Sequence, residues 1–241
     1  MSDRHLFFSK PMFAAIRALP GRCSIALCLA LALTGAAAPA ESTPAREFSA
    51  DIASRDAAGT AIGTGARLYA ANGKVRIETP EVPAGFFLID SQAGNSLFVR
   101  PAQRIYMDSK QSTRLTQIFV PVDPEHPCPQ WRAAAIQAGV ADAGGEWRCE
   151  RIHIAIVGGR NTIEYRVVSP QQQSSRRWID ADLGFPVKLQ AADGTTVSLE
   201  NIRIETQPAG LFTLPQGFQK LDPQALINKI KHSDVWVEPP K

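Results

Sequence analysis

Apolar and polar residues alternate through most of the chain from residue 48 onward. Phe48, Ala50 and Ile52 alternate with polar or small neighbours, and Ile152 and Ile154 repeat the pattern further along. A period of two residues is typical of strands with one buried face. The pattern predicts about ten or eleven strands. They fall at residues 48–53, 65–70, 74–79, 86–90, 96–100, 104–108, 149–155, 162–168, 177–179, 186–190 and 196–204.

Short turn signals separate these strands. Ala71-Asn72-Gly73 is a strong hairpin signal, because Asn-Gly tolerates the positive φ angles of a tight turn. Gly158-Gly159 and Asp193-Gly194 mark two further turns. Short links between successive strands favour one antiparallel sheet, and a sheet this large curls or closes. The sequence therefore predicts a mainly β (α+β) fold with a single antiparallel sheet; whether it curls into an unclosed barrel or closes is left open by these signals, and the family resemblance given below implies the unclosed barrel.

The middle of the chain has a different pattern. Residues 112–119 and 131–140 are the best internal helix candidates, and Asp222 is placed to cap a C-terminal helix that reaches Lys231. A curled sheet has a concave apolar face that another element must cover. We expect the two short internal helices to cover it. Between them the chain is irregular and proline-rich, with Pro121, Pro124, Pro127 and Pro129.

The first forty residues have the pattern of a secretion signal. Four basic residues precede an apolar run at 23–33, and Ala38-Pro39-Ala40 supplies the small residues that signal peptidase reads. Cleavage near Ala40 would leave residues 41–241 as one domain outside the cytoplasm. The run is shorter than the roughly 20 residues of a membrane-spanning helix, so it is not expected to remain as an uncleaved anchor. Once it is removed, no stable membrane insertion is expected. Met12 is an alternative start, with a shorter basic region.

Loss of residues 1–40 changes the charge balance. The chain has 26 basic and 23 acidic residues, and the first forty hold four of the former and one of the latter, which leaves 22 of each. Nucleic-acid binding needs clustered Lys and Arg, so no nucleic-acid partner is expected. Arg176-Arg177 is a short basic pair and is interpreted as a solvated strand edge.

Two cysteines, Cys128 and Cys149, remain after signal cleavage. An even pair in an oxidising compartment predicts a disulfide, here stapling a proline-rich insertion at about 120–149. A metal site with His126 and His153 is the alternative. The strand through residues 149–155 would separate Cys149 from His153 by about 13 Å, too far for both to bind one ion. The disulfide is therefore favoured, with no metal site.

Catalytic motifs are not evident in residues 41–241. The sequence has no G-x-S-x-G, S-x-x-K or C-x-x-C motif, and its histidines there are His126, His153 and His232. Asp180 and Asp182 could form a carboxylate pair, but they lie between two predicted strands, where Asp commonly forms turns. No enzymatic activity and no cofactor are predicted. A hydrolase with a dispersed site stays a third hypothesis, which a pocket joining His153 to a carboxylate and a hydroxyl would support.

Three passages carry a resemblance to a known family. They are GARLY at 65–69 with GKVRIE at 73–78, RWID at 177–180 followed by LGFPVKL at 183–189, and the ending LFTLPQGFQKLD at 211–222. The ending is similar to a closing motif F-x-L-P-x-G-[YF]-x-K. Together they resemble the LolA/LolB-like superfamily of periplasmic lipoprotein carriers and related periplasmic families of unknown function. The resemblance implies a strongly curled, unclosed sheet whose concave side takes up acyl chains in the known carriers.

The first functional hypothesis is a non-enzymatic periplasmic protein that holds a lipid or other apolar ligand in the concave face. The alternative is an envelope interaction or sensing protein that binds a protein partner at a sheet edge. The candidate lining residues are the apolar residues of the strands and helices nearest that face, which could equally be ordinary core. They are Phe86, Leu88, Leu97, Val99, Ile105, Met107, Leu115, Ile118, Phe119 and Trp178.

Overall fold

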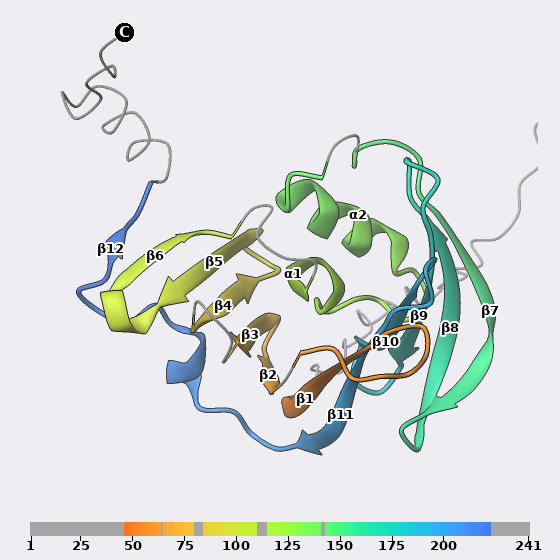
Figure 1. Cartoon of the computed structure of the whole chain (residues 1–241), viewed down its shortest axis with the longest axis horizontal. Helices are drawn as coiled ribbons and strands as arrows, with labels where there is room; N and C mark the ends of the chain where they lie inside the picture. The colour runs from red at the N-terminus through yellow and green to blue at the C-terminus, as the bar shows by residue number, and fades with distance from the viewer. Residues whose placement is uncertain (1–45, 64, 80–83, 110–114, 141–142, 223–241) are drawn as a thin grey trace, which may run out of the picture. The chain divides into compact units, whose positions relative to one another are not determined.

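Twelve strands form one sheet in the described part of the chain (Figure 1). The computed structural model describes residues 46–63, 65–79, 84–109, 115–140 and 143–222. The signal segment and the C-terminal helix beyond Asp222 were predicted outside these residues. The strands are β1 Phe48–Arg55, β2 Ala66–Ala71, β3 Lys74–Thr79, β4 Gly85–Asp90, β5 Asn95–Arg100, β6 Ile105–Asp108, β7 Arg148–Val157, β8 Arg160–Val168, β9 Ser174–Asp180, β10 Phe185–Ala191, β11 Thr196–Ile204 and β12 Gln219–Lys220.

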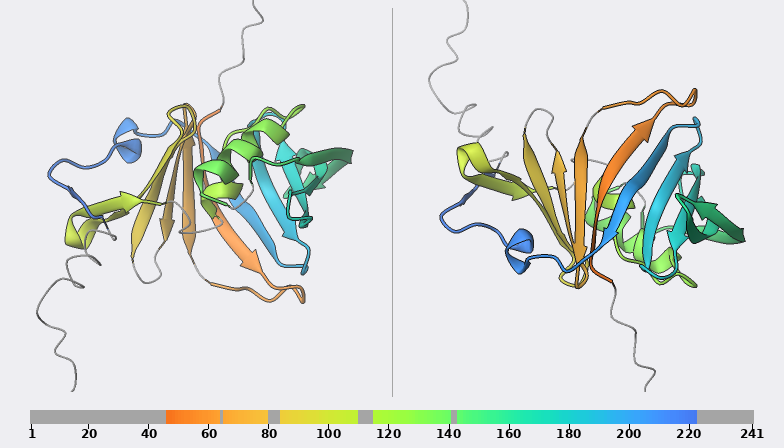
Figure 2. Two further views of the ribbon diagram at one scale, coloured as in Figure 1. Left: turned by 90° about the horizontal axis from the view of Figure 1, so that it is seen from above. Right: turned by 90° about the horizontal axis from the view of Figure 1, so that it is seen from below.

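The sheet is built from two meanders that meet at β1. β1 pairs with β2 on one side and with β11 on the other, and the full order is β12-β6-β5-β4-β3-β2-β1-β11-β10-β9-β8-β7. All pairs are antiparallel except β12, which runs parallel to β6. The sheet is thus mixed rather than purely antiparallel. Its ends, β12 and β7, do not pair, so the predicted curled, unclosed barrel is confirmed (Figure 2).

The local signals explain most strand positions. Asn72 and Gly73 have φ angles of 51° and 76°, as the predicted Asn-Gly turn between β2 and β3 requires. Phe48, Ala50 and Ile52 of β1 are all buried, on the period of two read from the sequence. β12 was not predicted, because its two residues lie inside the closing motif and carry no alternation.

Two helices lie on one face of the sheet, here called the inner face (Figure 1). They are α1 Leu115–Ile118 and α2 Cys128–Gln137. α1 lies inside the predicted 112–119, of which residues 112–114 are outside the described part, and α2 begins and ends three residues before the predicted 131–140. α2 begins early because Pro129 in its first turn has no N–H to satisfy and a φ suited to a helix. The segment between β6 and β7 therefore crosses the inner face as its cover. No helix of the described residues is long and apolar enough to span a membrane.

Aromatic contacts attach the two helices to the sheet. Phe119, just after α1, stacks on Phe185 of β10 with ring centroids 6.4 Å apart. Trp131 of α2 meets Tyr165 of β8 edge to face at 6.1 Å. Phe119 and Trp131 are at most 1% exposed. Burial of such side chains contributes roughly 1.5–3 kcal/mol each, so these are the main attachment points of the cover.

The opposite, outer face is covered by the end of the described chain. Phe86, Leu88 and Val99 form a second apolar cluster there, against which Leu214 and Phe218 pack. The 3₁₀ turn η2, Ala209–Phe212, precedes these two residues; a first such turn, η1, spans Pro101–Gln103. The closing motif thus has a packing role on the outer face.

A disulfide joins Cys128, the first residue of α2, to Cys149 of β7, as predicted. The bond spans 21 residues of sequence and connects the cover to the edge strand of the sheet.

We expect the double substitution Cys128→Ala/Cys149→Ala to lower the free energy of unfolding by about 3 kcal/mol, since the unfolded chain loses its closed loop. Urea denaturation of the oxidised protein and the variant measures this difference. The wild type with reductant should match the variant. Equal midpoints for oxidised wild type and variant would contradict the expectation.

Candidate ligand-binding cavity

A cavity of about 600 Å³ lies between the inner face of β8–β10 and the two helices. Its apolar wall combines α1 and α2 with the sheet. The residues of this wall are Ile118, Ala135, Val140, Trp147, Val167, Leu189, Ala191 and Ala192. The volume is within the roughly 300–1,000 Å³ typical of small-molecule sites. We call this space the inner cavity.

A polar rim closes one side of the inner cavity. Most of its residues come from the segment between β8 and β9 and from the start of β9, and Gln117 of α1 and Asp193 after β10 also belong to it. The segment supplies Ser169, Gln171, Gln172 and Gln173, and the start of β9 supplies Ser174 and Ser175. Gln172 has a positive φ of 60° and its side-chain oxygen accepts from Arg148. The cavity is therefore two-sided, with an apolar wall and a rim of hydroxyl and amide groups.

Arg177 is the one basic residue among the cavity-lining residues. It lies on β9, and its guanidinium carbon is 4.6 Å from the ring centroid of Trp131 in α2. Burial disfavours the charged form and lowers the pKa of Arg177 to about 10, so the side chain is still a cation at neutral pH. The interpretation of Arg176-Arg177 as a solvated strand edge is thus wrong for Arg177, because its side chain points to the inner face.

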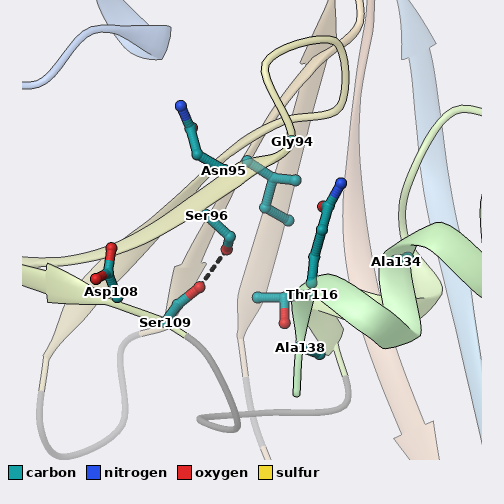
Figure 3. Close-up of a pocket in the computed structure, with 10 residues that line it drawn as sticks. Gly94, Asn95, Ser96, Asp108, Ser109, Thr116, Ala134 and Ala138 are labelled. Atoms are coloured by element: carbon teal, nitrogen blue, oxygen red, sulfur yellow. Dashed lines mark hydrogen bonds between the residues drawn. The ribbon is translucent and has the colours of Figure 1, made fainter. Parts of the chain in front are cut away.

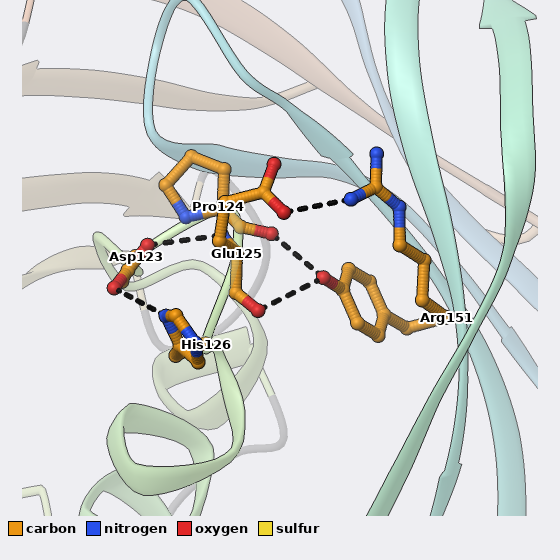
Figure 4. A network of polar contacts seen from close by, with 6 residues as sticks. Asp123, Pro124, Glu125, His126 and Arg151 are labelled. Atoms are coloured by element: carbon orange, nitrogen blue, oxygen red, sulfur yellow. Dashed lines mark hydrogen bonds and ion pairs between the residues drawn. The ribbon is translucent and has the colours of Figure 1, made fainter.

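A polar network holds the loop that leads into α2 (Figure 4). Tyr165 Oη donates to the carbonyl of Pro124 at 2.8 Å, and Arg151 pairs with Glu125 at 2.7 Å. The backbone N–H of Glu125 donates to Asp123 and, with His126 beside it, lowers the pKa of the Asp123 carboxyl. The start of the cover is therefore fixed to β7 and β8.

A second, smaller pocket of about 160 Å³ lies at the ends of β5 and β6 (Figure 3). Ser96 and Ser109 line it, and their hydroxyls bond to each other. Asp108 and Thr116 add further polar atoms. This pocket is too small for more than a few atoms, so the inner cavity is the stronger candidate site.

Five of the predicted lining residues belong to the inner side or to α1. Ile118 lines the inner cavity itself. Phe119 is part of the main core, and Met107 packs against that core. Ile105 lies two residues from Met107 and so on the same face of β6. Leu115 begins α1, and its side chain is outside the described part.

The other five lie away from the inner cavity. Trp178 follows Arg177 in β9 and so faces outward, where Lys188 Nζ lies 4.7 Å from its ring centroid. The remaining four lie on the outer face. Because β4 is buried on both faces, hydrophobicity alone does not show which of its residues point inward. The four are Phe86, Leu88, Leu97 and Val99.

Sequence reasoning missed the inward-facing residues on the strands around Trp178. Val167, Arg177 and Leu189 form the inner face of β8, β9 and β10, and each alternates with an outward neighbour. The register between strands, which fixes the face, was the missing signal.

His153 does meet a carboxylate. Its Nε2 lies 3.5 Å from Glu164, which also pairs with Arg176 at 3.3 Å. These residues do not line the inner cavity, so the arrangement predicted for a hydrolase is only partly present. Asp180 forms a turn instead: its Oδ1 accepts the backbone N–H groups of Asp182 and Leu183. Within the described residues no His, Cys, Asp and Glu group could hold a metal ion.

Comparison with known proteins finds distant structural matches and assigns no function. No protein-family model matches the chain, and the search of curated proteins found no match. An uncharacterized conserved protein from Thermus thermophilus matches at 12% identity and TM-score 0.42, over 73% of this chain and 90% of that one. MucB matches at 13% identity and TM-score 0.40, over 71% of this chain and 58% of its own length.

A LolA superfamily protein, NE2245 from Nitrosomonas europaea, matches at 12% identity and TM-score 0.33, over 71% of this chain and 91% of that one. Structures of the superfamily that the sequence resembles are thus among the matches. Identities this low concern the fold alone, and the chain spans little more than half of MucB.

We expect Tyr165→Phe to lower the free energy of unfolding by about 1 kcal/mol at neutral pH, through loss of the bond to Pro124. Burial raises the pKa of Tyr165 above its usual value of 10.0, so the wild type loses stability as pH rises from about 10 through the folded pKa. The variant should lack this loss. Denaturation between pH 8 and about 11 tests it, with Tyr69→Phe, at a half-buried tyrosine, as control.

Proposed function

We propose that this chain is a non-enzymatic, exported binding protein that holds a lipid or another apolar ligand in the inner cavity. The observation that carries the proposal is the cavity itself, about 600 Å³ beside a largely apolar wall. Val167, Leu189 and Ala135 are among the lining residues and are at most 9% exposed, so the apolar wall is formed by residues at the edge of the packed core. Ligand uptake would fill the inner cavity with apolar atoms.

The cover is held to the sheet at several points and ends at the cavity wall. The disulfide, the Trp131–Tyr165 contact and the Tyr165–Pro124 bond hold the start of α2. Ile118 of α1 is buried in the core and also lines the cavity, and Val140 after α2 belongs to the cavity wall. The cavity therefore lies where the cover ends, beside the polar rim.

Two features support a location outside the cytoplasm. The pattern of residues 1–40 is that of a signal peptide, and a disulfide such as Cys128–Cys149 persists in an oxidising compartment. The periplasm meets both conditions. The sequence resemblance to periplasmic carriers agrees with it.

Filling the cavity tests the function. We expect Ala135→Phe to reduce co-purifying or added lipid by about tenfold, because the new ring occupies the apolar wall and small overpacking costs about 1–3 kcal/mol. Native mass spectrometry of the protein purified without detergent measures the bound fraction. Ala133→Phe, on the exposed side of the same helix, is the matched control and should bind as wild type.

Wild-type protein that carries no lipid, and is not stabilised by added lipids, would count against the proposal. So would equal binding by Ala135→Phe and Ala133→Phe when circular dichroism shows both variants folded.

A second candidate function is supported by β7. Among the described strands this ten-residue edge strand pairs with β8 alone, and Ile154 and Ile156 on it are 65% and 76% exposed. Soluble proteins normally blunt such edges with charge, proline or short length. An extended segment of an envelope protein could add to β7 as a further strand, with its apolar side chains on these isoleucines.

A photocrosslinking residue at Ala155 should then capture a protein partner in cells, and Ile154→Lys with Ile156→Lys should reduce capture by about tenfold through loss of apolar contact. The same residue at Ile204, exposed on an interior strand, is the control. A yield of captured partner that is unchanged by the lysine substitutions would exclude strand addition at this edge.

A further inference from the structure

Two neighbouring buried donors, one on a residue that lines the inner cavity and one on the ring stacked against it, have no acceptor among the described residues. They are Nε of Arg177 and Nε1 of Trp131, and the two side chains stack on each other. Both groups can only donate hydrogen bonds. Buried donors in folded proteins are nearly always satisfied, so an unsatisfied pair at one place indicates a missing acceptor.

The charge of Arg177 is also unmatched. Its cross-strand neighbours are Tyr165 on β8 and Leu189 on β10, neither of which is acidic, and no ion pair joins Arg177 to a described carboxylate. Asp193 is the one carboxylate among the cavity-lining residues, and its Oδ1 accepts from the backbone N–H of Thr195. Trp131 offsets part of the charge through its ring face.

Other buried charges of this fold have partners. Asp180, 2% exposed, pairs with Arg160, and Glu164, 3% exposed, pairs with Arg176 and His153. Nε of Arg67 and of Arg100 also lacks an acceptor among the described residues, but of these three arginines Arg177 is the one that lines the inner cavity. A guanidinium is the side chain best suited to bind a carboxylate or phosphate, because its planar fork donates two parallel bonds.

The surroundings define the rest of the ligand. Ser175 and Ser174 lie beside Arg177 in β9, and the rim adds further hydroxyl and amide groups that can donate to anionic oxygens. Val167 and Leu189 lie on the same inner face and present hydrocarbon. A ligand that suits both parts has an anionic head and an apolar chain.

We infer that the inner cavity takes an anionic amphiphile, whose carboxylate or phosphate oxygens accept from Arg177 while its hydrocarbon chain lies along the apolar wall. The inference rests on the proposed function and deepens it by adding a head-group charge. Burial of Arg177 beside a cation-stabilising ring, with its pKa still well above neutral, agrees with a site that stays positive in the periplasm.

Binding of matched chains tests the inference. Delipidated protein, residues 41–241 with the disulfide intact, is titrated with dodecanoate, dodecyl phosphate and dodecanol in competition with a fluorescent alkyl probe. We expect the two anions to bind at least about tenfold more tightly than the alcohol, which corresponds to about 1.4 kcal/mol. Arg177→Gln should remove this preference without weakening dodecanol. Arg166→Gln, which removes an exposed charge on β8, should keep it.

The outcomes separate the two proposals. If dodecanol binds as tightly as the anions, or if Arg177→Gln retains the preference, the anionic inference is overturned and the apolar cavity stands. If none of the chains binds, both fail. Inorganic phosphate that competes as well as dodecyl phosphate would point to a free-anion site and overturn the amphiphile. Should Arg177→Gln not fold, the wild-type preference and Arg177→Lys decide, since lysine keeps the charge and should keep part of the preference.

Discussion

The structure depends on covering the apolar inner face of a sheet that curls without closing. The segment between β6 and β7 meets this constraint with two short helices rather than with further strands. Its attachment includes the Phe119–Phe185 stack, the Trp131–Tyr165 contact and the disulfide. Further apolar residues of the cover are buried in the same core, namely Ile118, Val120, Val122 and Ala134.

The space that remains has a consistent chemical character. Where the cover is anchored, the inner face is packed; beyond the anchors, Val167 and Leu189 border a cavity. The same place holds Arg177, which is stacked on an anchor residue, Trp131, but has no acidic partner in the described chain. A cavity with a hydrocarbon wall and an unmatched cation is unfavourable when empty, and both costs fall when an amphiphilic anion occupies it.

Much of the fold could be predicted from sequence because strands with one buried face show a period of two. The Asn72-Gly73 turn and the Cys128–Cys149 bond were likewise readable from local chemistry. The site was not. β4 is buried on both faces and gives no alternation, so Phe86 was placed inside although it packs outside. Arg177 was read as solvated, because only strand register and the contact with Trp131 show that it faces inward.

The most direct measurement is a crystal structure of residues 41–241 purified from the periplasm without detergent or delipidation. The account predicts elongated density along Val167 and Leu189, with its polar end at the guanidinium of Arg177. An inner face on which α1 and α2 pack directly against β8–β10, with Arg177 turned to a protein carboxylate and no space left for a ligand, would contradict it.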